Sequence, residues 1–212
     1  MAEIFEYRGV EGVVIAEVTG DDNETEGGYK TGTVEPLLPV AEIGKTTESS
    51  SEAHYYDNQP MIVINSEGPD EITITGAGMT LEKLAKITGK SYDPTTGMFV
   101  DGPRQVRYFA LGYKTKDSDG KYRYVWRLKG TFAIPDANHA TEDDGTDATG
   151  TELTFTGIYT VHQFTKGKYN GTTWEKGPAK GVVVSDRENL TDVSTFFNSV
   201  ATPDTIKPKT GT

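Results

Sequence analysis

Alternating apolar and polar residues recur along much of the chain and predict β-strands. The longest such stretch is TELTFTGIYTVHQFT, residues 151–165, where Leu153, Phe155, Tyr159 and Val161 follow the period of two that a half-buried strand shows. Shorter strands are predicted at residues 10–19, 60–65, 70–76, 104–115, 121–129 and 181–185. The chain is therefore predicted to be mainly β.

Turn residues between these strands predict two hairpins. Asp119-Gly120, within residues 104–129, is a dipeptide typical of tight hairpin turns. The sequence SEGPD predicts a second hairpin between the strands at 60–65 and 70–76. Both pairs are expected to be antiparallel neighbours.

The strand at residues 121–129 has an aromatic face. Tyr122, Tyr124, Trp126 and Leu128 alternate with other residues, so their side chains point to the same side. Packing in a core is the expected role of the three aromatic residues.

Two helices are predicted. TLEKLAKIT, residues 80–88, begins with Thr80 as a capping residue and is followed by Gly89, which favours a helix end. It makes only about two turns, so it needs packing against a sheet. LTDVSTFFNSV, residues 190–200, places its apolar side chains on one side and predicts a C-terminal helix.

Polar stretches without a sustained apolar face are predicted to be loops or arms. AEIGKTTESSSEAHYYD, residues 41–57, is expected to be a long functional loop, and residues 136–150 an acidic loop. The tail 201–212 is expected to be flexible. Residues 1–200 then form a single domain with an N-terminal arm.

Composition narrows the class of protein. Hydrophobic residues make up 34% of the chain, below the usual globular share, so much of it is expected in loops, arms or wet interfaces. No apolar run approaches the ~20 residues needed to cross a bilayer. Glu3 and Glu6 stand where a signal peptide would be basic and then apolar, so we expect the protein to be made and kept in a cytoplasm.

The sequence contains no recognisable reaction centre, and we predict no catalytic residue, metal or cofactor. It has no cysteine, and His54, His139 and His162 are far apart in the sequence, whereas a zinc site needs clustered donors. Neither DSDG, residues 117–120, nor EDDGTD, residues 142–147, has the spacing of a calcium loop. A hairpin turn and a solvated loop are the better interpretations.

The charge of the chain points away from nucleic-acid binding. The formal net charge is −11, which repels phosphate. Solubility is one interpretation of this charge, and a surface that nucleic acid passes without sticking is another.

The order of these features resembles the major tail tube proteins of long, non-contractile-tailed bacteriophages. Within residues 40–200, the likeness is carried by HYYDNQP, DEITITGAGMTLEKLAKITG, VRYFALGYK with KYRYVWRLKGTF, and TELTFTGIYTV followed by FFNSV. The likeness lies in the order of the elements and in short local sequences, not in an invariant motif. Some members of the family carry an additional immunoglobulin-like domain, which we do not expect in this chain.

The resemblance implies a β-sandwich or partial barrel with one short flanking α-helix and a C-terminal helix. Six copies would form a ring whose inner strands join into one barrel, and rings would stack into a tube through which DNA is ejected without specific binding. The implied partners are further copies of the chain and the tape-measure, tail-tip and tail-terminator proteins, with no membrane. The implied location is the virion tail, assembled in the host cytoplasm.

The resemblance also suggests two sets of site residues. The carboxylates expected to line the lumen are Glu48, Glu52, Asp70, Glu71 and Glu152. The residues expected between subunits or rings are Glu42, Lys45, Tyr55, Tyr56, Asp57 and Trp174.

Two other classes of function remain open at this point. One is a binding module, such as a phage decoration or receptor-binding protein or a bacterial adhesin. The other is a hydrolase without a visible motif, because an acidic β protein offers many pairs of carboxylates.

Overall fold

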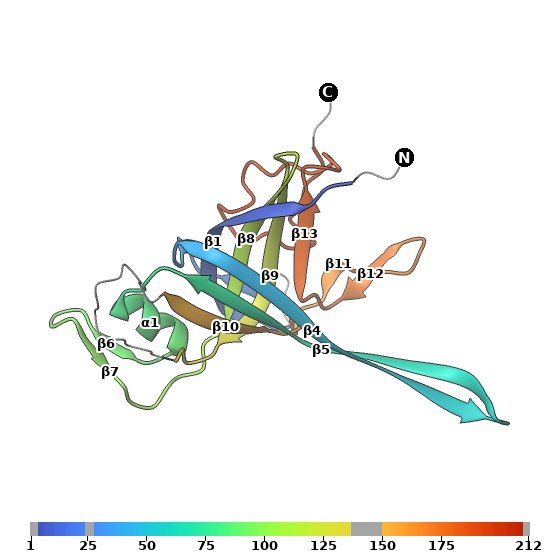
Figure 1. Ribbon diagram of the computed structural model, residues 1–212, viewed down its shortest axis with the longest axis horizontal. Coiled ribbons are helices and arrows are strands. Elements are labelled where there is room, and N and C mark those ends of the chain that lie inside the picture. The colour runs from blue at the N-terminus through green and yellow to red at the C-terminus, as the bar shows by residue number, and fades with distance from the viewer. Residues whose placement is uncertain (1–3, 24–27, 137–149, 210–212) are drawn as a thin grey trace, which may run out of the picture.

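The computed structural model describes residues 4–23, 28–136 and 150–209, and these form a mainly β fold with one α-helix (Figure 1). The elements are β1 (Tyr7–Asp21), β2 (Tyr29–Thr31), β3 (Glu35–Pro36), β4 (Val40–Tyr56), β5 (Gln59–Gly76), α1 (Leu81–Thr88), β6 (Ser91–Asp93), β7 (Met98–Val100), β8 (Phe109–Asp117), β9 (Tyr122–Phe132), β10 (Thr151–Gly157), β11 (Phe164–Tyr169), β12 (Trp174–Gly177) and β13 (Gly181–Ser185).

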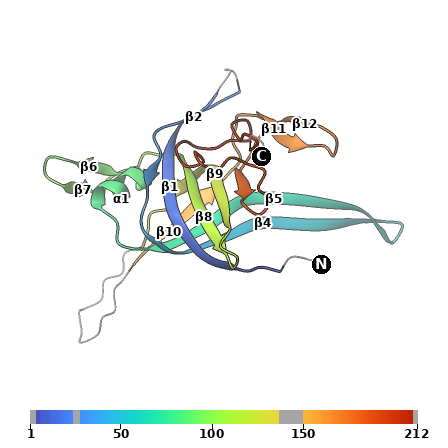
Figure 2. The same ribbon diagram turned by 90° about the horizontal axis from the view of Figure 1, so that it is seen from above.

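One antiparallel sheet organises the chain, and it branches at β9. Its order is β2-β1-β8-β9-β10-β5-β4, with β3 beside β1 and β13 beside β9. Residues Arg123–Arg127 of β9 pair with β13, whereas Gly130–Phe132 pair with β10. The branch divides the sheet into a layer of β1, β8, β9 and β13 and a layer of β10, β5 and β4 (Figures 1 and 2).

The main core lies between these two layers. Ile15, Leu111 and Val125 point inward from one layer, and Ile72 and Phe155 point inward from the other. The alternation of inward apolar and outward polar residues is the pattern by which a strand buries one face. Helix α1 contributes Ile87 to the same cluster.

A second core covers the opposite face of β1, β8 and β9. Trp126 is fully buried there, and its indole Nε1–H donates a hydrogen bond of 2.9 Å to the carbonyl of Phe196. The predicted core role is confirmed for Trp126, while Tyr122 and Tyr124 are half-buried. The Tyr124 ring lies 5.6 Å from the Phe196 ring.

Two local predictions are confirmed in detail. Helix α1 begins after Thr80, whose hydroxyl accepts a 3.4 Å hydrogen bond from the Lys83 N–H, and ends at Gly89 with a left-handed φ of 71°. Asp119-Gly120 lies in the turn between β8 and β9, and Gly120 has a φ of 82°.

The predicted loop at 41–57 and the predicted hairpin at SEGPD are both wrong. Residues 40–56 form β4, which pairs with β5 along its length, and β5 continues without a turn through SEGPD. The chain reverses instead at Asp57 and Asn58, where φ is 49° and 62°. Cross-strand backbone bonds can hold a strand that has no apolar face of its own, so the polar sequence of β4 did not reveal it.

The predicted strand at 151–165 is too long. β10 ends at Gly157, and Tyr159 and Val161 are 44% and 54% exposed. The carboxylate of Asp21 accepts hydrogen bonds from the N–H groups of Val161 (2.9 Å) and His162 (2.8 Å). These bonds hold the chain in a loop, so the apolar alternation after Gly157 does not continue as a strand.

The predicted helix at 190–200 and the predicted flexible tail are also wrong over the described residues. The chain forms turns there, in which Asp192 Oδ1 accepts the Ser194 N–H at 3.0 Å. Such a side-chain bond competes with helical backbone bonds. Ala201 and Thr202 are buried. Further along, the Lys209 N–H donates to the Leu190 carbonyl at 2.9 Å, so the described part of the tail is held to the body.

Candidate assembly surfaces

The outer side of the β4–β5–β10 layer is a polar surface, here called the threonine–glutamate face. Its cross-strand rows are Glu42–Thr75–Glu152, Gly44–Thr73–Thr154 and Thr46–Glu71–Thr156. These residues are half-buried or exposed, while the residues between them on β5 and β10 are buried. Within the described parts of the chain, nothing packs over this face to bury it.

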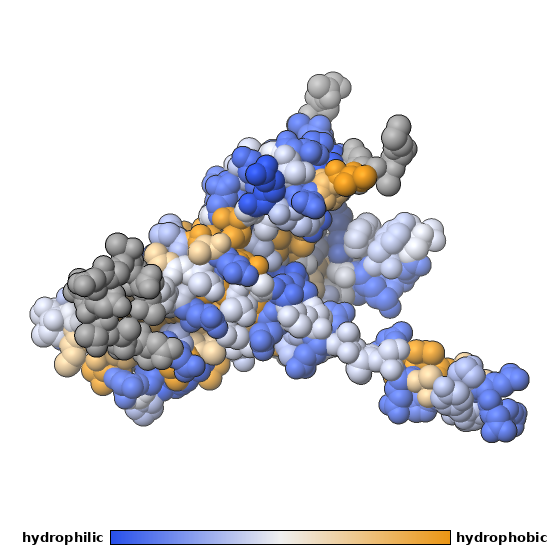
Figure 3. Space-filling model, viewed as in Figure 1, coloured by the Kyte–Doolittle hydropathy of each residue, from blue (hydrophilic) through white to orange (hydrophobic). Residues whose placement is uncertain are grey.

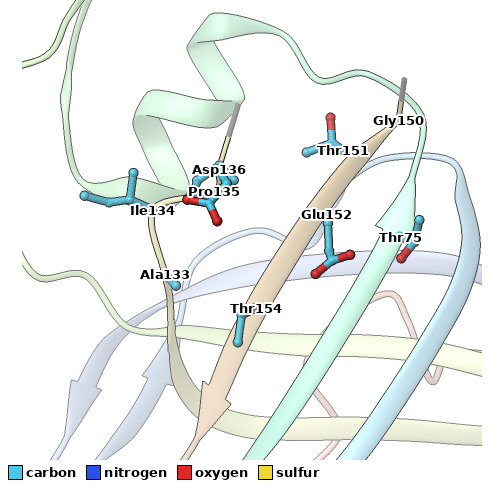
Figure 4. A pocket seen from close by; sticks show the side chains of 9 residues that line it. All are labelled: Thr75, Ala133, Ile134, Pro135, Asp136, Gly150, Thr151, Glu152 and Thr154. Atoms are coloured by element: carbon cyan, nitrogen blue, oxygen red, sulfur yellow. The ribbon is translucent and has the colours of Figure 1, made fainter. Parts of the chain in front are cut away.

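A shallow hollow of about 500 Å³ lies at one end of this face (Figure 4). Glu152, Thr75 and Thr154 contribute to it from β10 and β5, and the chain around Ile134 and Asp136 forms the opposite wall. The predicted acidic loop continues from here, but its residues 137–149 lie outside the described residues. The lining holds hydroxyls and carboxylates without a basic group, which matches a face that repels phosphate.

Two of the five predicted lumen carboxylates lie on the threonine–glutamate face. Glu71 and Glu152 are exposed there, together with Glu42, which sequence reasoning assigned to contacts between subunits. Glu48 and Glu52 lie elsewhere, on the part of β4 beyond the body. The prediction for Asp70 is wrong: it is 1% exposed, because it has the same parity as Ile72 and points inward.

Asp70 is the centre of an ion cluster. Its carboxylate lies 3.1 Å from Arg127 Nη1, 3.3 Å from Lys45 Nζ and 3.6 Å from Lys180 Nζ, and it accepts a 2.8 Å hydrogen bond from the Thr47 hydroxyl. Burial by itself would raise the pKa of the Asp70 carboxyl. The Thr47 hydrogen bond and the charges of Arg127 and Lys45 outweigh burial and lower that pKa below its ordinary value.

Lys180 ties this cluster to the next segment of β5. It precedes β13, and its ammonium donates to Glu67 Oε1 at 2.6 Å and to the carbonyl of Gly68. Lys45, predicted as a contact between subunits, is instead a member of the cluster. The cluster therefore joins β4, β5, β9 and the start of β13 where the β4–β5 hairpin leaves the body.

Beyond this point, residues 48–68 of β4 and β5 form an arm, here called the distal hairpin (Figures 1 and 2). Met61, Ile62, Val63 and Ile64 are each between 51% and 62% exposed. Successive residues point to opposite sides, so both sides of the ribbon carry apolar groups. An apolar patch is visible on the arm in Figure 3.

The distal hairpin brings together three of the predicted contact residues. Tyr55 and Tyr56 are 67% and 53% exposed beside Asp57 at its tip. Trp174 lies apart from them on β12, where it is 56% exposed and its ring is 5.1 Å from the Tyr169 ring. The apolar run itself was predicted as a strand but not as a surface. Its exposure could have been recognised from the strand opposite it, because Ile62, Val63 and Ile64 pair with His54, Ala53 and Glu52 of β4, which offer little apolar surface.

Asp117 and His162 each have a partner within the fold. Asp117 accepts the N–H groups of Asp119 and Lys121 at 3.0 and 2.9 Å and pairs with Arg187 at 2.7 Å, so DSDG is a braced hairpin turn. His162 Nδ1 lies 2.9 Å from the Asp22 carbonyl. His139 is outside the described residues.

Neither a metal site nor a membrane-spanning helix is found among the described residues. No three or more His, Cys, Asp and Glu side chains there are grouped so that they could hold a metal ion. No helix among these residues has the length and apolar character to cross a membrane.

Comparison with protein-family models and with curated proteins found no match for this chain. The function is therefore inferred from the sequence pattern and from these surfaces.

Proposed function

We propose that this chain is a structural subunit that assembles with copies of itself into rings, and that the rings stack into a phage tail tube through which DNA is ejected. The main support is the uncovered threonine–glutamate face on a layer whose last strand, β4, has a single partner strand among the described residues. A layer of this kind can continue into the next copy, because an unpaired strand edge is a template for another strand.

Ring closure would remove that free edge. A head-to-tail contact between copies closes into a ring when its rotation permits, and a closed barrel has no edges. In such a ring, the apolar side of the layer stays in each subunit's core, and the threonine–glutamate face lines the bore. Glu42, Glu71 and Glu152 would then repel the phosphates of passing DNA.

The distal hairpin supports assembly independently. Two-stranded ribbons are marginally stable alone, and contiguous exposed apolar groups mark interaction sites. Tyr55 and Tyr56 at its tip belong to a residue type that often anchors interfaces. In the proposed tube, this arm contacts a neighbouring subunit, and the tape-measure, tail-tip and tail-terminator proteins are the further partners.

Electron microscopy of the concentrated protein tests this proposal. We expect six-fold rings or tubes in negative stain. A chain that stays monomeric at every concentration would contradict the proposal. Persistent monomers that bind a glycan would instead favour a surface-binding module, for which the exposed tyrosines at the tip are the supporting observation.

Charge reversal tests the assignment of the bore. The variant E42K/E71K/E152K should still form tubes, because these side chains point away from the core, but its tubes should retain DNA in a salt-dependent manner. E6K/E11K/E82K is the matched control, with three exposed glutamates reversed elsewhere. Equal DNA retention by both variants would argue against this face as the bore.

A further inference from the structure

Strand β13 has a free edge in the described structure. Its partner is β9: the Lys180 carbonyl accepts the Leu128 N–H at 2.8 Å, and the Asp186 N–H donates to the Tyr122 carbonyl at 2.9 Å. Antiparallel bonding alternates along a strand, so the residues between these two points that face β9 are the even-numbered ones. The backbone groups of Gly181, Val183 and Ser185 therefore point away from β9 toward the free edge.

A groove follows this edge, here called the β13 groove. It consists of two hollows that meet at Val183, of about 430 Å³ and 300 Å³. The larger is lined by Trp174, Val182, Pro203 and Ile206, among others. Trp174 and Val183 are 56% and 49% exposed, so apolar surface lies directly beside unpaired backbone groups. Such an edge accepts an extended segment by strand addition.

The distal hairpin carries a matching edge. Beyond the residues of β5 that pair with β10, the strand has β4 as its single partner among the described residues. Residues 61–65, MIVIN, have no charge and no proline, so nothing in them blocks pairing. An apolar strand with a free edge is the kind of segment that the β13 groove fits.

The charges around the two surfaces are complementary. Residues 48–68 contain Glu48, Glu52, Asp57 and Glu67 and neither lysine nor arginine. The groove is lined by Lys166, Arg123 and Glu188. Residues 164–178, which border it, add the exposed Lys168 and Lys176 against Glu175, and Asp204 adjoins them through its hydrogen bonds to Thr165, which leaves a small excess of positive charge. Opposite potentials favour encounter and fix the orientation of partners.

The hairpin of the same copy does not fill the groove. Lys180, immediately before β13, holds Glu67 and Gly68 at the root of the hairpin. From there the arm extends away from the body in both views (Figures 1 and 2). At about 3.3 Å per residue, the apolar run lies roughly 10–20 Å beyond its root. A second copy is therefore needed to supply it.

We propose that residues 61–65 of one copy add as a strand to the free edge of β13 in a neighbouring copy. This inference rests on the proposed tube-forming function, since it names the acceptor of the arm. The donor and acceptor surfaces differ, so the contact is heterologous and repeats from copy to copy. Pairing would bury both apolar surfaces and satisfy the outward backbone groups of β13.

Disulfide trapping tests the contact, because the chain has no native cysteine. V63C and V183C, purified separately with different isotope labels, are mixed, assembled and oxidised. Paired strands bring Cα atoms within the 4.4–6.8 Å that a disulfide needs. We expect a V63C–V183C disulfide between differently labelled chains by mass spectrometry, with M98C and V183C as a control mixture that forms no such bond.

The possible results separate the two proposals. If the unmodified chain forms no oligomer, both fail. If tubes form and no V63C–V183C disulfide appears, only the pairing of these strands fails. A third mixture combines I4C with V183C. A disulfide between these two variants, without one between V63C and V183C, would assign the groove to the N-terminal segment and overturn the inference.

A second pair of variants tests the strand edge without cysteine chemistry. V183P removes an N–H that points away from β9, so it leaves the β9–β13 ladder in place. V183T keeps that N–H and changes only the side chain. We expect V183P to fold but lose at least tenfold in assembly at a given concentration, and V183T to assemble. Equal assembly of folded V183P and V183T would overturn the inference.

Discussion

The two halves of the β4–β5 hairpin share the same pair of strands but have opposite surroundings. Near the body, Ile72 and Ile74 are fully buried, and Asp70 lies within the ion cluster. In the distal half, Ile62 and Ile64 are 51% and 54% exposed, although they lie on the same strand. Residue type is therefore not what separates the halves.

The difference lies in what covers each half. The proximal half has α1 and the β1–β8–β9 layer over its apolar side, so its own chain completes its core. The distal half has no second layer, and backbone pairing between two strands gives it little stability. A segment of this kind gains its packing from another molecule, and this contrast motivates both proposals above.

Removing the carboxylate at the junction of the halves should have the largest effect. D70A leaves Arg127, Lys45 and Lys180 without their shared partner, and breaking a buried ion pair in this way costs about 3–5 kcal/mol. Urea unfolding of the monomer measures the loss. E71Q, one residue away on the outer face, is the control and should change stability by less than about 0.5 kcal/mol. Similar losses in the two variants would contradict the structural role given to the cluster.

Identical truncations in the two halves should have unequal effects. I72A creates a cavity in the core and should lower the free energy of unfolding by about 2–5 kcal/mol. I64A removes an exposed side chain and should lower it by less than about 0.5 kcal/mol in the monomer. Light scattering measures assembly. Relative to the stability that each variant loses, I64A should reduce assembly more than I72A does. Equal losses of monomer stability would mean that the distal half is also packed.

Lowering the pH should reduce the stability of the proximal half, but by less than the D70A substitution does. The pKa of Asp70 is lower in the folded chain than in the unfolded chain, so its contribution is complete above the ordinary carboxyl pKa. That contribution is lost as the pH falls through the folded-state value. Protonated Asp70 keeps its Thr47 contact, so less is lost than on deletion. Unfolding measured from pH 7 to pH 2 should show a steeper decline for the native chain than for D70N, and parallel curves would refute this.

The turn at the tip should give the smallest effect. Asn58 has a φ of 62°, a left-handed conformation that glycine adopts without steric cost. N58G should stabilise the distal hairpin by at most about 1 kcal/mol and leave global unfolding unchanged. Amide hydrogen exchange at Ala53 and Val63 should slow, while exchange at Ile72 should not. Slower exchange in both halves would show that they unfold as one unit.

The sequence was sufficient where a signal is local. Thr80 and Gly89 mark the ends of α1, and Asp119-Gly120 marks the β8–β9 turn, because capping and turn preferences depend on a few neighbouring residues. The sequence was insufficient where contacts with distant parts of the chain determine the local structure. The polar residues of β4 form a strand because β5 lies beside them, and the apolar residues after Asp192 form turns because side-chain bonds and packing on Trp126 hold them.

The candidate surfaces divide in the same way. Alternation along each strand separates Glu71 from the isoleucines of β5 and Glu152 from Leu153 and Phe155 of β10, because side chains along a strand repeat every two residues. The pairing of β5 with β10 then puts both glutamates on one face. The same alternation puts Asp70 on the side of Ile72 and Ile74, but only the packing of the layers brings three cations around it, from β4, β9 and the start of β13. Packing also decides that residues 61–64, MIVI, are exposed. Their sequence is typical of an apolar strand, but burial requires a second layer of structure. The described residues of one copy do not provide that layer there.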